Sequence, residues 1–136
     1  MKVLIDTNVI MDVLENRLPH FECSEKVFDI IVTGGFGFIT ATQTKDLFYF
    51  VNRNTNSKQR ARDVINQLTD DFKVLDVLTN DVQNALSSDM PDYEDALIAH
   101  CAARNGMDYI ITRNAKDFEA SPIAAITPKD FLETNL

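Results

Sequence analysis

Carboxylates stand at or just beyond the ends of short apolar runs in this sequence, where they could form a cation site. Four of them come from four separate segments of the chain: Asp6, Asp46, Asp95 and Asp117. Carboxylates that lie close together repel one another, so they must be protonated or neutralised by a cation. Hard oxygen ligands suit Mg²⁺ or Mn²⁺, and such an ion can hold a phosphate and lower the pKa of a bound water. The pattern therefore favours metal-assisted phosphoryl chemistry that needs no histidine base.

A structural role is the alternative for each of these acids. Asp6 could be a helix N-cap, because Asp accepts hydrogen bonds from the first helical turn. Asp92 and Asp95 lie in an expected first turn, where the helix dipole stabilises an acid by about 0.3–1 kcal/mol. Asp46 could be an ordinary solvated charge, and Asp117 could cap a turn. These separate explanations become harder to sustain if one edge of a sheet gathers all four acids.

Alternating strand and helix patterns indicate which elements must position these acids. Short aliphatic runs predict strands, and apolar residues at helical spacing predict helices. Strands are expected at residues 2–5, 36–40, 73–78, 109–112 and 123–126, and helices at 7–15, 21–32, 42–51, 57–68, 81–87, 91–103 and from 128 onward, with a polar turn at 52–56. This alternation predicts an α/β fold: a three-layer α/β/α sandwich with a central parallel sheet of about five strands, in one domain over residues 1–136. Ligands bind beyond the carboxyl ends of such strands, which is where the acids fall.

Composition excludes several other classes of protein. The 136 residues include 13 Lys and Arg against 21 Asp and Glu, a formal net charge of −8, which disfavours broad neutralisation of nucleic-acid phosphates. No apolar run approaches the length of about 20 residues needed to span a bilayer, and Asp6 comes too early for a signal peptide. The two cysteines and two histidines form no zinc motif or nucleophilic triad. A cytoplasmic protein with reduced thiols is therefore expected.

Three stretches of the chain resemble the motifs of the PIN-domain nucleases in order and spacing. They are Val3-Leu4-Ile5-Asp6-Thr7-Asn8, residues 92–99 (DYEDALIA) and residues 111–118 (ITRNAKDF). The resemblance implies that Asp6 is the first metal-binding acid, Asp95 the third and Asp117 the late acid. The second position, usually Glu in the family, is Asp46 here, which is one methylene shorter. The residues implied to support these acids are Thr7, Asn8, Asp92, Thr112 and Asn114.

The same resemblance implies a metal-dependent endoribonuclease. Family members hydrolyse single-stranded RNA by metal-activated water, with one or two Mg²⁺ or Mn²⁺ ions, and small stand-alone bacterial members are often VapC-like toxins of type II toxin–antitoxin pairs. An antitoxin protein and a second copy of the chain are accordingly possible partners. Because Asp46 replaces the usual Glu, a catalytically weak module that binds RNA or protein is the alternative. A receiver-type signalling domain is disfavoured because residues 36–40 end without an acid.

Basic residues gather in one part of the sequence and could contact RNA phosphates. Between Lys45 and Arg62 there are five basic residues against one acid, Asp46. The expected RNA-binding residues are Lys45, Arg53, Lys58, Arg60, Arg62, Arg113 and Lys116. An ordinary solvated helix face explains the same pattern equally well. Tyr93, close in sequence to Asp95, is a candidate for base stacking or for a position at the rim of the site.

Overall fold

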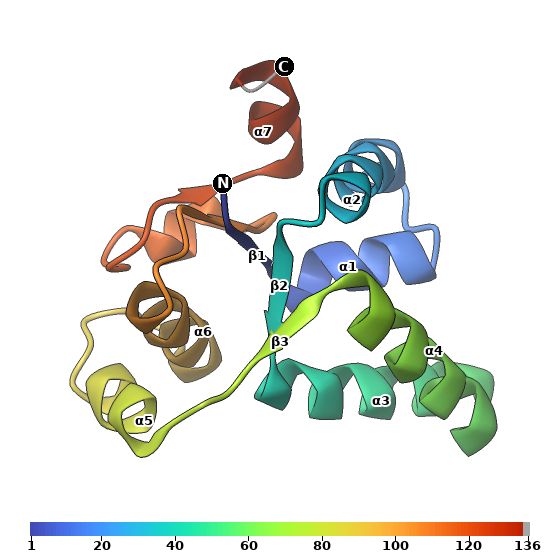
Figure 1. Ribbon diagram of the computed structural model, residues 1–136, viewed down its shortest axis with the longest axis horizontal. Helices are drawn as coiled ribbons and strands as arrows, with labels where there is room; N and C mark the ends of the chain where they lie inside the picture. The colour runs from blue at the N-terminus through green and yellow to red at the C-terminus, as the bar shows by residue number, and fades with distance from the viewer. Residues whose placement is uncertain (135–136) are drawn as a thin grey trace.

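The computed structural model describes residues 1–134 and contains a five-stranded sheet in which every strand pairs in parallel (Figure 1). The strands are β1 (Val3–Ile5), β2 (Gly37–Thr40), β3 (Lys73–Leu75), β4 (Tyr109–Ile111) and β5 (Ala125–Ile126), in the spatial order β3-β2-β1-β4-β5. β1 is central, and Leu4 pairs with Phe38 on one side and with Ile110 on the other. The carboxyl ends of the strands therefore lie along one edge of the sheet.

Within residues 1–134, seven α-helices and one short 3₁₀ helix connect the strands. They are α1 (Thr7–Leu14), α2 (Phe21–Gly34), α3 (Ala41–Thr55), α4 (Lys58–Asp71), α5 (Thr79–Leu86), α6 (Tyr93–Arg104) and α7 (Pro128–Thr134), with the 3₁₀ helix η1 (Ala115–Phe118) after β4. Figure 1 shows α5 and α6 on one side of the strands and α1, α2 and α4 on the other. The predicted three-layer α/β/α architecture is confirmed. None of the helices in this described part of the chain combines the length and hydropathy needed to cross a lipid bilayer.

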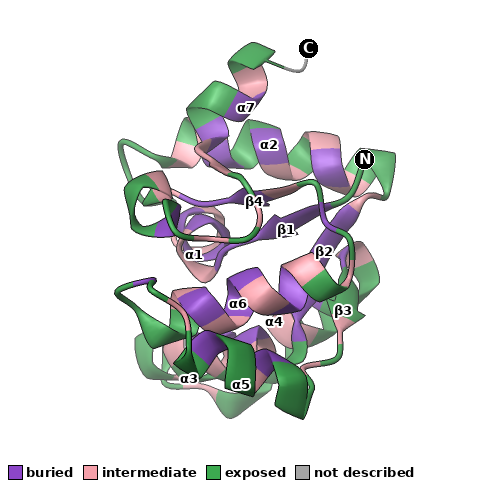
Figure 2. Cartoon of the chain, turned by 90° about the vertical axis from the view of Figure 1, so that its left-hand side faces the viewer, coloured by how far each residue is buried: buried purple, intermediate pink, exposed green. Residues whose placement is uncertain are grey.

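Alternate residues of the central strand are buried against opposite helix layers, which explains why the strand is apolar throughout. Val3 and Ile5 pack with residues of α1, α2 and α7, whereas Leu4 packs with residues of α5 and α6. Figure 2 shows the buried strands between helices that bury one face and expose the other. The core thus holds β1 from both sides and sets the direction in which Asp6 leaves it.

α3 is longer than the sequence pattern predicts, and the prediction of a polar turn at residues 52–56 is wrong. The helix continues through Thr55, and only Asn56 turns out of it, with a φ of +52°. Polar side chains in the last turn have partners that keep the helix formed. Asn54 donates to Glu15 just after α1, and Thr55 Oγ1 donates to a carbonyl of its own helix at 2.7 Å. These contacts outweigh the turn preference of the asparagines.

An ion pair between the exposed Arg104 and the buried Asp81 holds α6 against the segment after β3. Arg104, at the end of α6, donates to both carboxylate oxygens of Asp81 at 2.9 and 3.0 Å and to the carbonyl of Asp76 at 2.7 Å. Burial alone would raise the pKa of Asp81, but the hydrogen bonds from Arg104 and from a backbone N–H outweigh it and hold that pKa below its usual value. β3 ends at Leu75, earlier than predicted, because its neighbour β2 ends at Thr40, the residue that pairs with Leu75. The contacts of Arg104 anchor the helix whose first turn contains Asp95.

Candidate active site

Asp6 leaves the carboxyl end of β1 and caps α1. Its Oδ1 accepts from the backbone N–H of Thr7 at 2.7 Å, and its Oδ2 accepts from the hydroxyl of Thr112 at 2.8 Å. Asp6 is only 6% exposed. Burial raises the pKa of Asp6, and the two hydrogen bonds oppose that shift. Asp6 therefore has the capping role and also lies at the sheet edge where ligands bind.

Residues from α1 and from the end of β4 meet beside Asp6 through a small hydrogen-bond network. The buried hydroxyl of Thr112 also accepts from the backbone N–H of Asn114 at 3.1 Å and from Nδ2 of Asn8 at 3.4 Å. Oδ1 of Asn8 in turn accepts from the backbone N–H of Arg113 at 3.3 Å. The network holds the loop after β4 against the start of α1.

Gln43 shapes the site and is absent from the sequence-based predictions. It is 1% exposed, and its Nε2 donates to the carbonyl of Ile5 at 2.8 Å and to Oγ1 of Thr7 at 3.3 Å. Its Oε1 accepts from the backbone N–H of Thr40 at 2.7 Å, while Thr40 Oγ1 accepts from the N–H of Gln43 at 3.2 Å. This Thr-x-x-Gln capping box is the sequence signal that could have revealed it. The amide joins the ends of β1 and β2 and fixes the first turns of α3, which contain Asp46.

Four acids line one pocket of about 230 Å³ at this edge of the sheet. They are Asp6, Asp46, Glu94 and Asp95. Lys45 lines it too, with Nζ 3.6 Å from Oδ1 of Asp46, and so does Tyr93, which is 45% exposed. The structure thus brings together three of the predicted ligands and adds Glu94, whose position beside Asp95 in the first turn of α6 is the signal for it. Asp92 and Asp117 do not line this acidic pocket.

Asp95 experiences the charges of the acids around it. Burial and, in decreasing order of effect, the negative charges of Asp6, Asp92, Asp117 and Glu94 together raise the pKa of Asp95 to about 7. Its backbone N–H donates to Oδ1 of Asp92, the N-cap of α6, at 3.0 Å. Asp92 and Asp117 therefore act on the acidic pocket through their charge rather than by lining it. A cation among these acids would reverse the shift.

Replacing Asp95 with Asn is expected to stabilise the metal-free protein at alkaline pH. The folded protein holds the Asp95 proton more tightly than the unfolded chain does, so the free energy of unfolding falls as pH rises from about 4 to about 7. We expect Asp95→Asn to raise that free energy by about 1–2 kcal/mol near pH 8, a value reduced for partial exposure, and to change it little near pH 4. Urea denaturation in EDTA, carried out near pH 8 and near pH 4, measures the free energy of unfolding of each protein. Equal stabilities at alkaline pH, or the same gain from Asp63→Asn at an exposed position of α4, would contradict this expectation.

The donor set suits a hard divalent cation in kind, although it forms no closed ligand cage. The side-chain donors of the four lining acids are all carboxylate oxygens, which Mg²⁺ and Mn²⁺ prefer. Their mutual repulsion, expressed in the raised pKa of Asp95, is what a bound cation would relieve. Within residues 1–134, no three His, Cys, Asp or Glu side chains are grouped closely enough to enclose an ion. An ion held by one or two carboxylates and otherwise by water, a usual arrangement for Mg²⁺, fits this open pocket.

Comparison with known proteins identifies the family to which this chain belongs. A family model described as the PIN domain matches residues 2–116, which include Asp6, Asp46 and Asp95. The chain belongs to the PIN-domain family. The resemblance inferred from the three motifs is confirmed, and Asp117 lies just beyond the matched region.

This PIN domain is similar in sequence to a ribonuclease and in fold to chains of toxin–antitoxin structures. It is 24% identical to Ribonuclease VapC1 of Aquifex aeolicus (strain VF5) over 137 aligned residues. The alignment covers 97% of this chain and 94% of that protein. Its fold is similar to a chain of a toxin–antitoxin complex from Klebsiella pneumoniae, with a TM-score of 0.71 and 19% identity over 93% of this chain and 98% of that one. A chain of DNA-bound VapBC from Salmonella typhimurium is also similar in fold, with a TM-score of 0.70 and 21% identity. The match covers 94% of this chain and 98% of that one. These structures share the fold of this PIN domain.

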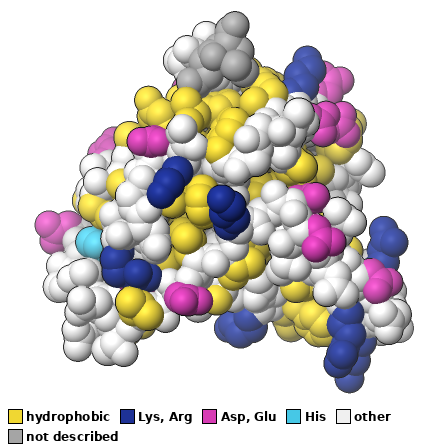
Figure 3. Space-filling model, in the orientation of Figure 1, with side chains coloured by type: hydrophobic (Ala, Val, Ile, Leu, Met, Phe, Trp, Pro, Cys, Tyr) yellow, Lys and Arg dark blue, Asp and Glu magenta, His cyan; other side chains and the backbone are white. Residues whose placement is uncertain are grey.

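The PIN domain separates the basic residues that lie close together in its sequence. Of the five between positions 45 and 62, only Lys45 lines the acidic pocket. Arg53 lies over the rings of Tyr49 and Phe50, 5.7 and 5.6 Å from their centroids, and Arg60 lines a different hollow beside α1. On the face drawn in Figure 3, Lys and Arg side chains are scattered among Asp and Glu. Contacts between RNA and Arg53, Lys58, Arg60 and Arg62 stay a prediction. They would need an RNA strand that extends beyond the acidic pocket.

Arg113 has a structural partner that the sequence pattern does not reveal. Its Nε lies 2.7 Å from Oδ2 of Asp12, a completely buried acid of α1, and Arg17 lies 3.9 Å from Oδ1 of the same acid. Burial raises the pKa of Asp12, while the positive charges of Arg113, His20 and Arg17 oppose the shift. The pair ties the loop after β4 to α1. Arg113 stays a predicted RNA contact through the part of its guanidinium that Asp12 leaves free, and Lys116 is exposed on η1.

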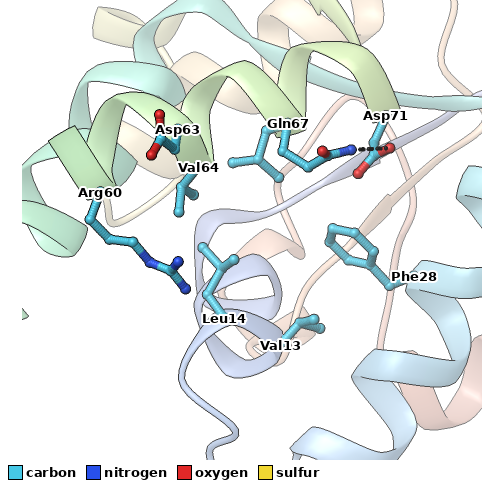
Figure 4. A pocket seen from close by; sticks show the side chains of 9 residues that line it. Val13, Leu14, Phe28, Arg60, Asp63, Val64, Gln67 and Asp71 are labelled. Carbon is cyan, nitrogen blue, oxygen red and sulfur yellow. Dashed lines mark hydrogen bonds between the residues drawn. The ribbon is translucent and has the colours of Figure 1, made fainter. Parts of the chain in front are cut away.

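A second hollow of the PIN domain, of about 320 Å³, lies between α1, α2 and α4 (Figure 4). Its lining residues are the apolar Val13, Leu14, Phe28, Val64 and Leu68 and the polar Arg60, Asp63, Gln67 and Asp71. Gln67 Nε2 donates to Oδ1 of Asp71 at 3.2 Å. Two of the polar side chains at the edge of the hollow are therefore hydrogen-bonded to each other. None of the predicted catalytic acids lines this groove, which is therefore separate from the acidic pocket.

Proposed function

We propose that this PIN domain is an endoribonuclease that hydrolyses single-stranded RNA with Mg²⁺ or Mn²⁺. The observation that supports the proposal most directly is the acidic pocket, in which four carboxylates from three parts of the chain stand together. Such a site can act without a histidine base, and neither His20 nor His100 lines the pocket. The name of the relative Ribonuclease VapC1 agrees with this class of reaction.

Each residue of the acidic pocket has a part in the proposed reaction. Of Asp6, Asp46 and Asp95, one or two would hold the cation directly and the rest through bound water. Lys45 would contact a phosphate oxygen of the RNA. When bound, a divalent cation neutralises phosphate charge and lowers the pKa of a water. Thr112 keeps the Asp6 carboxylate in place through its hydrogen bond of 2.8 Å. Asp117 would act through its negative charge, which favours a cation beside Asp95.

Cleavage of a labelled single-stranded RNA tests the proposal. We expect cleavage in Mg²⁺ or Mn²⁺ and none in EDTA. Because water is the proposed nucleophile, a single deoxynucleotide at the cleavage site should not prevent hydrolysis. The products should then end in a phosphate and a hydroxyl. Intact RNA after incubation with Mn²⁺, or products that end in a cyclic phosphate, would reject the proposed reaction.

Asp46→Glu is expected to raise the rate of cleavage. The Asp46 side chain is 32% exposed and lines the acidic pocket, so a side chain one methylene longer has room there. We expect a rise of about threefold to tenfold, equivalent to roughly 1 kcal/mol of transition-state stabilisation, and a comparable fall for Asp46→Asn. Single-turnover cleavage in Mn²⁺ measures both variants. Wild-type protein that binds RNA without cutting it, combined with cleavage by Asp46→Glu, would instead favour a binding module with a weakened site.

A role as the toxin of a type II pair is the proposed physiological context. It is supported by the similar fold of chains from a toxin–antitoxin complex and from DNA-bound VapBC. An antitoxin needs apolar surface to bind, and the groove between α1, α2 and α4 provides Leu14, Phe28 and Val64. Induced expression should arrest growth, and co-expression of a small DNA-binding protein encoded beside this chain should restore it. Val64→Asp should prevent that rescue while RNA cleavage continues. Normal growth on induction would reject the toxin role.

A further inference from the structure

A third hollow, of about 270 Å³, lies between the start of α2 and the start of α7. It is lined by His20, Cys23, Ser24, Arg113, Thr127 and Lys129 together with two prolines, and we call it the basic pocket. Thr127 directly follows β5, and Arg113 follows β4 by one intervening residue, so the basic pocket lies at the same edge of the sheet as Asp6. None of the acids assigned to the proposed reaction lines it.

Ser24 is the clearest sign that the basic pocket accepts a ligand. Its side chain is completely buried, and its Oγ has no hydrogen-bond partner within residues 1–134. A buried hydroxyl left without a partner costs about 1–3 kcal/mol of stability. A ligand oxygen that accepts a hydrogen bond from Ser24 would remove this cost. Serine is therefore better suited to a ligand-bearing pocket than to helix packing alone, for which alanine has the higher propensity.

The start of α2 adds an electrostatic preference for an anion. α2 has 14 residues, and His20 at its N-cap position makes no side-chain hydrogen bond to the first turn. N–H groups at a helix start carry partial positive charge and bind anions. Cys23 and Ser24, which line the basic pocket, lie in and just after this first turn. An anion there would take the place of the missing cap.

Basic side chains from three separate segments complete the pocket. His20 precedes α2, Arg113 follows β4, and Lys129 lies in α7. One edge of the Arg113 guanidinium is occupied, because its Nε lies 2.7 Å from Asp12, which offsets part of its charge. His20 and Lys129 are exposed, and no Asp or Glu lines the pocket. The lining is thus basic in a protein whose net charge is −8.

We propose that the basic pocket binds a phosphate group of single-stranded RNA next to the phosphate that is cut. This inference rests on the proposed ribonuclease function and names where the substrate strand is held. Arg113 directly follows Thr112, whose hydroxyl donates to Asp6 at 2.8 Å, so the two pockets are adjacent along the chain. The basic pocket would add positive charge to that of Lys45, the one basic residue that lines the acidic pocket. This positive charge would offset the repulsion between the phosphates of the RNA strand and the carboxylates of the acidic pocket.

Inorganic phosphate tests the basic pocket directly. In amide NMR spectra of the full chain, phosphate should shift the signals of Cys23, Ser24 and Lys129, and chloride at equal ionic strength should not. Ser24→Ala and Lys129→Gln should each weaken phosphate binding by about threefold to tenfold, because each removes one donor to the anion. Lys26→Gln, at an exposed position of α2 that does not line the pocket, is the matched control. Equal phosphate affinities in all four proteins would overturn the site.

Binding of a short single-stranded RNA distinguishes a strand from a free anion. Loss of one phosphate contact lowers the slope of log affinity against log salt concentration by about 0.7 for a single strand. We expect this change for Lys129→Gln and none for Lys26→Gln, measured by fluorescence anisotropy in EDTA. In the cleavage assay, Ser24→Ala and Lys129→Gln should raise KM and leave kcat nearly unchanged. Phosphate binding with an unchanged salt slope and KM would overturn the assignment to RNA.

The outcomes also separate this inference from the proposed function. If the wild-type protein cuts no RNA while phosphate binding and the salt slope both respond to Lys129→Gln, the ribonuclease proposal fails and the phosphate subsite stands. If it cuts RNA while neither Ser24→Ala nor Lys129→Gln alters binding, the subsite fails and the reaction stands. Thermal unfolding guards against a folding defect, because Ser24→Ala removes an unpartnered hydroxyl and is expected to keep the protein at least as stable.

Discussion

Asp6→Asn is expected to lower the rate of RNA cleavage by at least about 100-fold, because it removes charge where a cation would stabilise the transition state. Asn has nearly the same shape as Asp, and its side-chain oxygen can still accept from the N–H of Thr7, so the cap of α1 is retained. The substitution also removes a charge that repels Asp95. Loss of activity without loss of stability is therefore expected. Single-turnover cleavage in saturating Mn²⁺ measures the loss of activity, and thermal unfolding measures the stability.

Asp29→Asn provides the matched control, since Asp29 is an exposed acid of α2. It should retain wild-type cleavage and Mn²⁺ affinity. Calorimetric titration should show weaker Mn²⁺ binding for Asp6→Asn alone. If Asp6→Asn changes neither the affinity for Mn²⁺ nor cleavage, Asp6 has no part in the proposed site.

Arg113→Met is expected to lower the free energy of unfolding by about 3–5 kcal/mol near neutral pH, the usual result of removing one partner of a buried ion pair. Asp12 is completely buried, and Arg113 Nε lies 2.7 Å from its Oδ2, whereas Arg17 is 3.9 Å from Oδ1. Methionine fills much of the same volume, so the loss comes from the uncompensated charge rather than from a cavity. Urea denaturation measures it. Lys116→Met, at an exposed position nearby, should change the free energy by less than about 0.5 kcal/mol.

A second substitution and a change of pH separate charge from packing at this pair. Combining Arg113→Met with Asp12→Asn should recover much of the lost stability, because it removes the buried charge. Burial already raises the pKa of Asp12, and loss of Arg113 would raise it further. Folding then favours the protonated acid, so the deficit of Arg113→Met should shrink as pH falls. A deficit that is independent of pH and is not relieved by Asp12→Asn would show that Arg113 acts through packing.

Local patterns in the sequence predict the type and order of the strands and α-helices described. The predicted strand at residues 2–5 and helix at 7–15 correspond to β1 and α1, because strand and helix periodicity depend on near neighbours in the chain. The starts of α4 and α6 are local in the same way, because Ser57 and Asp92 each cap their helix by accepting from a backbone N–H three residues on. The end of α3 escapes prediction because contacts with other helices stabilise its last turn.

Motifs predict part of the acidic pocket. Asp6, Asp46 and Asp95 line it as the strand ends and the helix start suggest. Glu94, which precedes Asp95 in the motif at residues 92–99, lines it as well, and Asp117 contributes charge from outside. The roles of these acids in metal binding and cleavage stay predictions that the variants above test.

The sequence by itself determines a parallel α/β fold with acids beyond the strand ends, since both follow from short-range patterns. Only the tertiary structure decides which distant residues meet. It places the Gln43 amide on the carbonyl of Ile5, pairs Arg113 with Asp12, and leaves Ser24 without a partner in the basic pocket. The physical reason is that these contacts join segments far apart in the chain. Their meeting depends on the strand order β3-β2-β1-β4-β5 and on helix packing, which no local pattern specifies.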